Sequence, residues 1–333
     1  MVLPGRPGGQ ECPPYGSKRG TVGASFRTRR ASSPIILGID LGGTSVKAVV
    51  VTPEGKRLAQ FNESFDPDRR LHFAETIRAM TKRVTSQFGG APRAIGLSAP
   101  GLTAKDARSV AFMPGRLAGL EGLVWSDYLG TSHPVPVLND AQAALLGEVW
   151  LGAARGYEDV ILLTLGTGVG GAAMVDGHLL RGHIGRAGHL GHICLDLDGA
   201  KDITNIPGSL EDMIGNWTVQ QRSRGRFATT HELVAAYKAG DSFAEEVWLR
   251  SIRALGCAIA SFVNILDPEA VVIGGGIARS GRSLLKPLQK ILDEVEWRPG
   301  GAKVKILAAK LGQFAGACGA ARHALASVNS ANG

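Results

Sequence analysis

The sequence predicts an α/β protein built on a duplicated unit of strand, glycine turn, strand, turn and strand. The first copy covers residues 35–61, with its glycine turn at 42–43, and the second covers residues 159–180, with its glycine turn at 166–171. A third glycine turn, at 274–276, follows the apolar stretch 269–273. Glycine turns after strands present free backbone N–H groups to anions. Three such turns, two of them in a repeated unit, indicate a phosphate or nucleotide site.

The first copy consists of apolar stretches at 35–39 and 46–51, a turn at 52–56 and a third strand at 57–61. Gly42 and Gly43 carry no Cβ, so the backbone can bend sharply and approach a phosphate closely. Thr44 and Lys47 add a hydroxyl group and a cation. Asp40, at the end of the first strand, could hold a hydrated Mg²⁺ that is bound to a polyphosphate.

The segment between the two copies alternates helices and strands. Apolar residues at steps of three and four predict a helix over about 68–88. A short strand at 94–98 ends before Gly101, and an irregular stretch follows to about 120. A strand at 135–138 leads into a helix over 141–150, for which Asn139 or Asp140 is the expected N-cap.

Asp140 lies between a short strand and a helix, which places it at the carboxyl edge of a sheet, where α/β proteins bind ligands. Phosphoryl transfer to a hydroxyl requires a group that accepts the hydroxyl proton, and Asp140 can be that base. The alternative interpretation is that Asp140 only caps the helix, which is the commoner role of aspartate at such a position.

The spacing of Gly166, Gly168 and Gly171 also fits the dinucleotide-binding fingerprint, but that fingerprint requires a helix after the glycines. Here residues 172–175 form a strand that leads into a tight turn, and no P-loop motif occurs. A long helix with one apolar face is expected over 243–262 and ends at 267–268. Further helices at 282–295 and about 314–327, with a strand at 303–308, complete the pattern.

Composition limits the class of protein. With 333 residues, 44% of them hydrophobic and 20% charged, the chain can form one large domain or two medium ones. No run of about 18 apolar residues and no apolar signal core occurs, so we expect a cytoplasmic protein without a membrane span. The four cysteines are scattered without a C-x-x-C pair, which argues against a disulfide framework and a cysteine-based zinc site.

The net charge of +8 is concentrated in the N-terminal tail. Residues 1–34 hold six basic residues against one acidic residue, a net charge of +5, and are rich in glycine, proline and serine. This composition predicts a disordered tail. It could be a polyanion-binding arm, an organelle-targeting leader or an over-extended start of the reading frame. The remainder is near neutral, so no nucleic-acid partner is expected.

Several motifs together resemble the ROK family of sugar kinases. In order and spacing they are Asp40-Leu41-Gly42-Gly43-Thr44, Asn139-Asp140, Leu165-Gly166-Thr167-Gly168-Val169-Gly170-Gly171, Gly191-His192, and Asp267-Pro268 with Gly274-Gly275-Gly276. The resemblance covers about residues 35–328 and implies a duplicated actin-like ATPase (RNase H-like) fold with two domains around a cleft. The domains are expected at 35–138, joined by a C-terminal helix at about 314–330, and at 139–313. Family members often form homodimers.

The resemblance also implies roles for individual residues. Asp140 would be the catalytic base, and Asp40 would lie near a Mg²⁺ carried by ATP. ATP would contact the three glycine turns through Gly42, Gly43, Thr44, Lys47, Gly166, Thr167, Gly168, Gly170, Gly274 and Gly275. The sugar would contact Gly101, Arg116, Asn139, His189, His192 and Glu211.

The sequence departs from the family at the sugar end. His189 stands where the family has a glutamate that touches the sugar, and Arg116 lies where a sugar-contacting asparagine is usual. Arg116 could bind an anionic substituent or form a surface ion pair. The family's zinc loop aligns with residues 202–211, but its three cysteines are replaced by Asp202, Thr204 and Ser209. We therefore expect no structural zinc, whereas Glu211 matches the closing glutamate of that loop.

These observations favour an ATP-dependent kinase that phosphorylates a hexose or amino-hexose. One alternative is a sugar- or nucleotide-binding protein that has lost catalysis, which His189 and the altered loop would explain. Another is a sugar-responsive transcriptional regulator. The 34 residues before the core are too rich in glycine and proline for the DNA-binding helix pair of such regulators.

Overall fold

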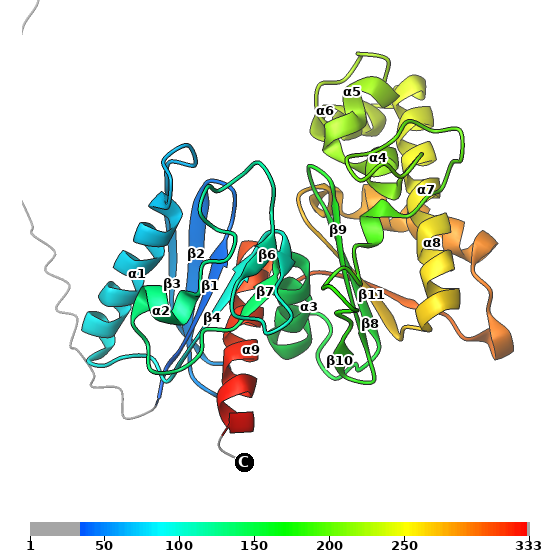
Figure 1. The fold of residues 1–333 in the computed structure, drawn as a ribbon. Helices are drawn as coiled ribbons and strands as arrows, with labels where there is room; N and C mark the ends of the chain where they lie inside the picture. The colour runs from blue at the N-terminus through cyan, green and yellow to red at the C-terminus, as the bar shows by residue number, and fades with distance from the viewer. Residues whose placement is uncertain (1–33, 332–333) are drawn as a thin grey trace, which may run out of the picture.

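The computed structural model describes residues 34–331, so the predicted basic tail lies, apart from Pro34, outside the described residues. Two five-stranded sheets form the frame of the molecule (Figure 1). The strands of the first sheet, in spatial order, are β3 (Arg57–Ser64), β2 (Ser45–Val51), β1 (Ile36–Leu41), β4 (Ala94–Ala99) and β7 (Val137–Asn139). Those of the second are β10 (His178–Leu179), β9 (Val169–Val175), β8 (Val160–Leu165), β11 (Ala270–Gly274) and β12 (Lys305–Ala308).

The two sheets have the same topology. Each begins with an antiparallel three-stranded meander, and two parallel strands are then added beside the first strand of the meander. The predicted duplication of the strand and glycine-turn unit is thus confirmed by the strand pairing. Because the copies are equivalent, the turns after β1 and β8 occupy corresponding places at the carboxyl ends of two similar sheets.

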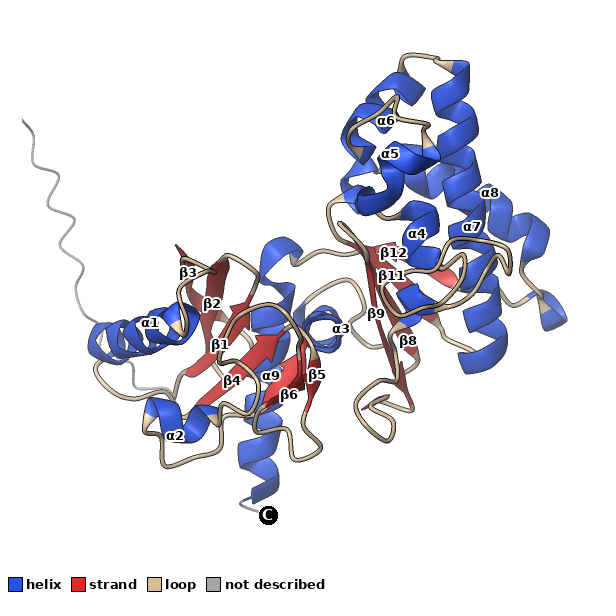
Figure 2. Cartoon of the chain, turned by 45° about the horizontal axis from the view of Figure 1, so that its top comes forward, coloured by secondary structure: helices blue, strands red, loops and turns tan. Residues whose placement is uncertain are grey.

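Helices cover both faces of each sheet (Figure 2). The longer ones are α1 (His72–Phe88), α3 (Asp140–Leu151), α6 (Thr230–Lys238), α7 (Ser242–Leu266), α8 (Arg282–Val295) and α9 (Ala315–Ala331), and the shorter ones are α2 (Trp125–Leu129), α4 (Leu210–Ile214) and α5 (Val219–Arg222). We call the first sheet with α1, α2 and α9 the first lobe, and the second sheet with α4 to α8 the second lobe. Helix α3 lies between the sheets and packs against α9 on one side and β8 and β9 on the other.

The alternation of side chains in β1 decides which helix each residue faces. Leu37 and Ile39 belong to the core cluster that includes α1, whereas Ile36 belongs to the cluster formed with α9. Gly38 and Asp40 are on the α9 side with Ile36. The carboxylate of Asp40 therefore emerges between the sheet and α9, on the side where α3 begins.

Glycines allow α9 to approach the first sheet and α3 very closely. A Cβ on Gly38 or Gly96 would overlap backbone atoms of α9, and a Cβ on Gly319 would overlap the backbone of α3. Gly147 of α3 faces the backbone of α9 in the same way. The helix predicted at about 314–327 is confirmed as α9, and its many alanine and glycine residues allow this close packing.

Some elements differ from the sequence prediction. Helix α1 begins at His72 rather than 68 because Leu71 takes a left-handed conformation, with φ of 60°. The stretch expected to be irregular contains a short hairpin of β5 (Leu102–Thr103) and β6 (Val110–Phe112). Among the described helices, α7 alone is long and apolar enough to cross a membrane. Its apolar face, including Trp248 and Leu255, packs in the core of the second lobe.

Glu148 joins the two chain segments that connect the lobes. Its side chain is fully buried in α3 and accepts hydrogen bonds from the backbone N–H groups of Ala153, Lys310 and Leu311 at 2.7 to 3.1 Å. Ala153 lies in the segment from α3 to β8, and Lys310 and Leu311 lie in the segment from β12 to α9. One carboxylate thus holds both connections in register.

We predict that Glu148→Gln lowers the stability of the protein by about 2 kcal/mol, because an amide NH₂ group would face backbone donors that the carboxylate now satisfies. Thermal unfolding of the variant should give a lower Tm than the parent protein. Glu246→Gln, which changes an exposed glutamate of α7, is the matched control and should leave the Tm unchanged. Equal Tm values for both variants would contradict this role of Glu148.

Candidate active site

The first glycine turn joins β1 to β2. The Gly42 N–H donates to the Ser45 carbonyl at 2.9 Å and closes the turn. Within the described residues, the N–H groups of Gly43 and Thr44 have no hydrogen-bond partner. Lys47 pairs with Asp40 across the hairpin, and its ammonium group lies 3.4 Å from the Ser45 hydroxyl. The turn therefore offers two free N–H donors beside a cation, which is the chemistry that binds phosphate oxygens.

Asp40 is held at the end of β1 by a residue of the neighbouring parallel strand. The Ser98 hydroxyl of β4 donates to Asp40 Oδ1 at 2.7 Å. Burial raises the pKa of Asp40 to about 6, the Ser98 hydrogen bond lowers it, and the nearby Asp140 carboxylate raises it further. Gly316 of α9 leaves the space that Asp40 needs, since a Cβ there would lie 2.7 Å from the Asp40 Cγ.

Asp140 is the first residue of α3, and Asn139 is the N-cap. Asn139 Oδ1 accepts from the Ala141 N–H at 3.0 Å, and its Nδ2 donates to the Gly101 carbonyl at 3.1 Å. Asp140 Oδ1 also accepts from the Ala141 N–H, at 2.8 Å. Water reaches the Asp140 carboxyl, but the surrounding protein reduces its hydration and raises its pKa. This effect outweighs the Ala141 hydrogen bond and the nearby His189, which lower the pKa.

The second glycine turn is fastened to the segment after α4. The Asn216 and Trp217 N–H groups donate to the Gly166 and Thr167 carbonyls at 3.0 and 2.9 Å, and the Val169 N–H donates to Glu211 Oε2 at 2.9 Å. A Cβ on Gly168 would overlap the Glu211 carboxylate. Glu211, expected to touch the sugar, is thus also a support of this turn.

Three glycines expected in turns, Gly170, Gly171 and Gly274, lie in strands instead. Gly170 belongs to β9, where a Cβ would overlap the Thr164 hydroxyl of β8. Gly274 is the last residue of β11, and the third turn proper begins at Gly275, with φ of 87°. Gly275 packs against the backbone of Leu165, so the third turn lies directly beside the end of β8 that enters the second turn.

Of the two histidines of the predicted sugar end, His189 lies near Asp140, and His192 lies near His189. The pKa of His189 is lowered, chiefly by burial and also by the nearby His192. Two groups oppose this shift: the Arg186 carbonyl, which lies 3.1 Å from His189 Nδ1, and the Asp140 carboxylate. His192 Nδ1 lies 2.7 Å from Asp202 Oδ2. Hydrogen bonds from His192 and Thr204 hold the pKa of Asp202 well below its usual range, although burial opposes this. His189 therefore interacts electrostatically with both Asp140 and His192.

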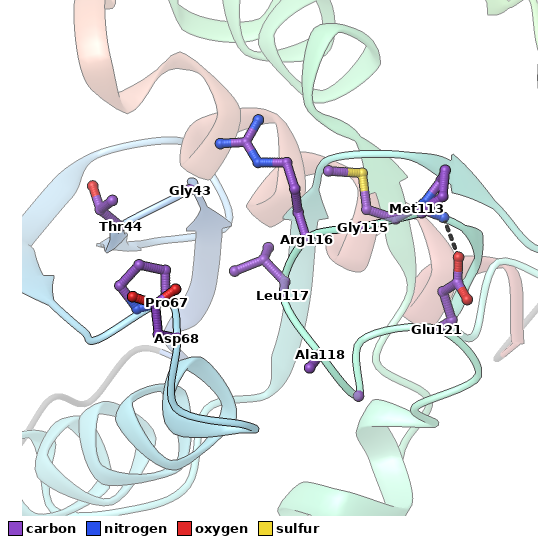
Figure 3. A pocket seen from close by; sticks show the side chains of 12 residues that line it. Gly43, Thr44, Pro67, Asp68, Met113, Gly115, Arg116, Leu117, Ala118 and Glu121 are labelled. Atoms are coloured by element: carbon purple, nitrogen blue, oxygen red, sulfur yellow. Dashed lines mark hydrogen bonds between the residues drawn. The ribbon is translucent and has the colours of Figure 1, made fainter.

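A cavity of about 730 Å³ lies beside the first glycine turn, between Gly43 and Thr44 and the loop that carries Arg116 (Figure 3). The Arg116 side chain points from this loop toward the turn, and its Nη2 lies 2.9 Å from the place of a Cβ on Gly43. No acidic partner of Arg116 occurs in the described part of the chain. Of the two roles considered for Arg116, the surface ion pair therefore has no support.

The site suits magnesium better than zinc. Asp40 and Asp140 supply hard oxygen ligands, and their mutual repulsion would be relieved by a divalent cation. At the positions of the zinc-loop cysteines, Asp202 accepts hydrogen bonds from His192 and Thr204, and the Ser209 hydroxyl caps α4. Structural zinc sites are built from Cys thiolates and His nitrogens, and these carboxylate and hydroxyl groups already have hydrogen-bond partners, so they do not fit a tetrahedral structural zinc site.

Sequence reasoning missed three supports of the site: Ser98, Gly316 and the N–H groups of residues 216–217. The role of Ser98 could have been predicted in part from the sequence, because Ser98 lies near the end of a strand that pairs in parallel with β1. The other two have no local signal, since each acts on a residue far away in the sequence.

Comparisons with known proteins agree with the geometry. A sequence model of the ROK family matches residues 36–327. A glucokinase of Thermotoga maritima is 31% identical over 313 residues, which cover 86% of this chain and 96% of the relative. A ROK hexokinase from Thermus thermophilus is similar in structure, with a TM-score of 0.77, 30% identity, and coverage of 89% of this chain and 99% of the other. A ROK family glucokinase from Streptomyces griseus, solved with glucose and AMPPNP, gives a TM-score of 0.69 at 30% identity, covering 87% and 99%.

We predict that Asp40→Asn stabilises the ligand-free protein above about pH 6. Folding raises the pKa of the Asp40 carboxyl from 3.8 to about 6. Between about pH 4 and pH 6 the folded protein therefore keeps a proton on Asp40 that the unfolded chain has lost, and the stability of the folded state falls as the pH rises through this range. Near neutral pH the variant should be more stable than the parent by on the order of 1 kcal/mol, after allowing for partial exposure, and should therefore have a higher Tm. The difference should vanish near about pH 4.

Asp68→Asn, which alters an exposed carboxylate of the same lobe, is the control and should follow the parent at every pH. A lower Tm for Asp40→Asn at neutral pH would show that the Asp40 carboxylate is not a source of instability.

Proposed function

Because this chain belongs to the ROK family, and is a carbohydrate kinase with the duplicated actin-like ATPase fold, we propose that it transfers the γ-phosphoryl group of ATP to a hydroxyl of a hexose or amino-hexose. The observation that supports this most directly is the pair of carboxylates, Asp40 near the end of β1 and Asp140 just after β7 of the same sheet, together with the free N–H groups of the first glycine turn. The names of the relatives make glucose the first acceptor to test.

Asp140 acts as the general base in this proposal. It accepts the proton of the acceptor hydroxyl as the hydroxyl oxygen bonds to the γ-phosphorus, and the bond to the bridging oxygen breaks to release ADP. Reduced hydration raises the pKa of Asp140, which makes the carboxylate a better proton acceptor near neutral pH. Asn139, as the N-cap, fixes the start of α3 and therefore the position of Asp140.

The glycine turns hold the donor. The free N–H groups of Gly43 and Thr44, the Lys47 ammonium group and the turn at 166–168 bind the phosphates, and Gly274 and Gly275 flank the adenosine. Asp40, with Asp140 nearby, would hold the Mg²⁺. When bound, this ion supplies positive charge that offsets the charge of the phosphates. Such charge stabilisation requires donors fixed in place before the reaction, as the hydrogen bonds of Glu211 and residues 216–217 fix the second turn.

The acceptor lies beside Asp140 in this proposal, in contact with Gly101, Asn139, His189, His192 and Glu211. The unpaired guanidinium group of Arg116 faces the first turn and can donate to acceptor oxygens or to the phosphoryl group in transfer. The homodimer and the cytoplasmic location expected from the sequence stay predictions. A binding protein without catalysis is less consistent with the chain, since Asp40, Lys47 and Asp140 are all present.

We predict that Asp140→Asn retains nucleotide binding but loses turnover by on the order of 10³-fold, because the amide cannot accept the hydroxyl proton. Turnover is measured as sugar phosphate formed with glucose and a panel of other hexoses and amino-hexoses, with ATP and polyphosphate as donors. Nucleotide affinity is measured by calorimetry with a non-hydrolysable ATP analogue.

The control is Asp127→Asn, a change of an exposed carboxylate in α2, which should leave turnover within about twofold of the parent. Near-normal turnover of Asp140→Asn would exclude it as the base. If the parent protein forms no sugar phosphate with any sugar and either donor, the catalytically silent alternative is correct.

A further inference from the structure

The segment that follows His192 folds into a compact hydrogen-bonded loop. Asp202 and Ile206 are joined by a backbone hydrogen bond of 2.9 Å, and the Gly208 N–H donates to the Ala200 carbonyl at 2.9 Å. The Leu195 N–H donates to the Gly208 carbonyl at the same distance. The loop then enters α4, which carries Glu211. Both His192 and Glu211 therefore depend on how this loop is closed.

Asp202 is the centre of the loop. Its side chain is only 1% exposed, and its two oxygens accept four hydrogen bonds. Oδ2 accepts from His192 Nδ1 at 2.7 Å, whereas Oδ1 accepts from the Thr204 N–H and hydroxyl, both at 2.8 Å, and from the Ile206 N–H at 3.1 Å. The carboxylate thus links His192 to the loop and organises the turn around itself.

These residues occupy the positions at which the family's zinc loop has cysteines. Asp202 and Thr204, at the first two positions, bond to each other, and Ser209, at the third, caps α4 by accepting from the Asp212 N–H at 3.3 Å. In the described residues there is no group of three or more His, Cys, Asp or Glu side chains suited to a metal ion. The loop is closed by hydrogen bonds at the place where a metal would otherwise join it to the histidine.

The contact with Asp202 also determines the tautomer of His192. A carboxylate accepts, so Nδ1 carries the proton, and Nε2 of the neutral ring is then a hydrogen-bond acceptor. Nε2 has no partner in the part of the chain described here. It is free to accept from a hydroxyl of the acceptor sugar, and the ring adjoins His189, which itself adjoins Asp140.

We propose that Asp202 is a positioning residue that replaces a metal ion in this chain: it closes the 202–209 loop and holds the His192 ring with Nε2 free for the acceptor sugar. The proposal rests on the proposed contact of His192 with the sugar. In metal sites, the hydrogen-bonded partner of a ligating histidine fixes the orientation of the ring, and its removal typically costs about 10–100-fold in metal affinity or activity. We take this range as the guide for a histidine that is oriented to contact a sugar.

The first experiment uses the unaltered protein. We expect less than stoichiometric zinc by mass spectrometry, and no change in Tm or sugar KM after chelation and resupply of Mg²⁺. In the ¹⁵N spectrum of the imidazole groups near neutral pH, His192 should be protonated at Nδ1. Stoichiometric zinc, or an unprotonated Nδ1, would overturn the proposal.

The second experiment compares Asp202→Asn with Asp198→Asn, which changes an exposed aspartate between His192 and the 202–209 loop. The asparagine retains an oxygen for Thr204 and Ile206 but presents an NH₂ group to His192 Nδ1. We expect the sugar KM of Asp202→Asn to rise by on the order of tenfold, while the KM for ATP stays within about twofold, and the proton of His192 to move to Nε2. Asp198→Asn should match the parent.

A sugar KM of Asp202→Asn equal to that of Asp198→Asn would overturn the positioning role. If Asp202→Asn fails to fold, the zinc content and the tautomer of the unaltered protein still decide the proposal. If the unaltered protein phosphorylates no sugar, the proposed function fails, yet the same two measurements still show whether Asp202 closes the loop in place of a metal.

Discussion

The close docking of α9 on the first sheet and on α3 is the constraint on which the site depends. At Gly38, Gly96, Gly147 and Gly319 a Cβ would overlap backbone atoms of the neighbouring element. Backbone atoms cannot move aside as the end of a flexible side chain can, so these positions require glycine. This docking brings the start of α3 to the end of β1, so that Asp140 and Asp40 come close enough to repel each other. The packing of small residues thus offsets the electrostatic cost of two neighbouring carboxylates.

The second lobe uses hydrogen bonds where the first uses packing. Its glycine turn is held by Glu211 and by N–H groups of residues 216–217, and the Arg222 guanidinium group donates to the Gly215 carbonyl at 2.7 Å. The loop centred on Asp202 leads into the same helix, α4. One continuous segment therefore links the proposed sugar contact at His192 to the turn proposed to bind phosphate.

The sequence was most informative where structure depends on local pattern. Alternating apolar residues and repeated glycine turns were enough to predict the duplicated sheets, and the motifs indicated Asp40 and Asp140. The missed features depend on distant partners. Gly170 pairs with Thr164 across two strands, and it is a glycine there because Thr164 leaves no room for a Cβ. Ser98 acts on Asp40 across parallel strands. The partners of Asp202 are close in sequence, but its role was hidden by the absence of the cysteines expected there.

The position of α9 in the chain affects how the protein is made. The face of the first sheet around Gly38 and Gly96 is formed by early residues, but the helix that covers it is the last one described. During synthesis this face stays uncovered until the second sheet has left the ribosome. The strands of that sheet lie between residues 160 and 308. Contacts between such distant segments form slowly. The lobe that begins the chain is therefore completed last, and Asp40 and Asp140 reach their final arrangement only when α9 has docked.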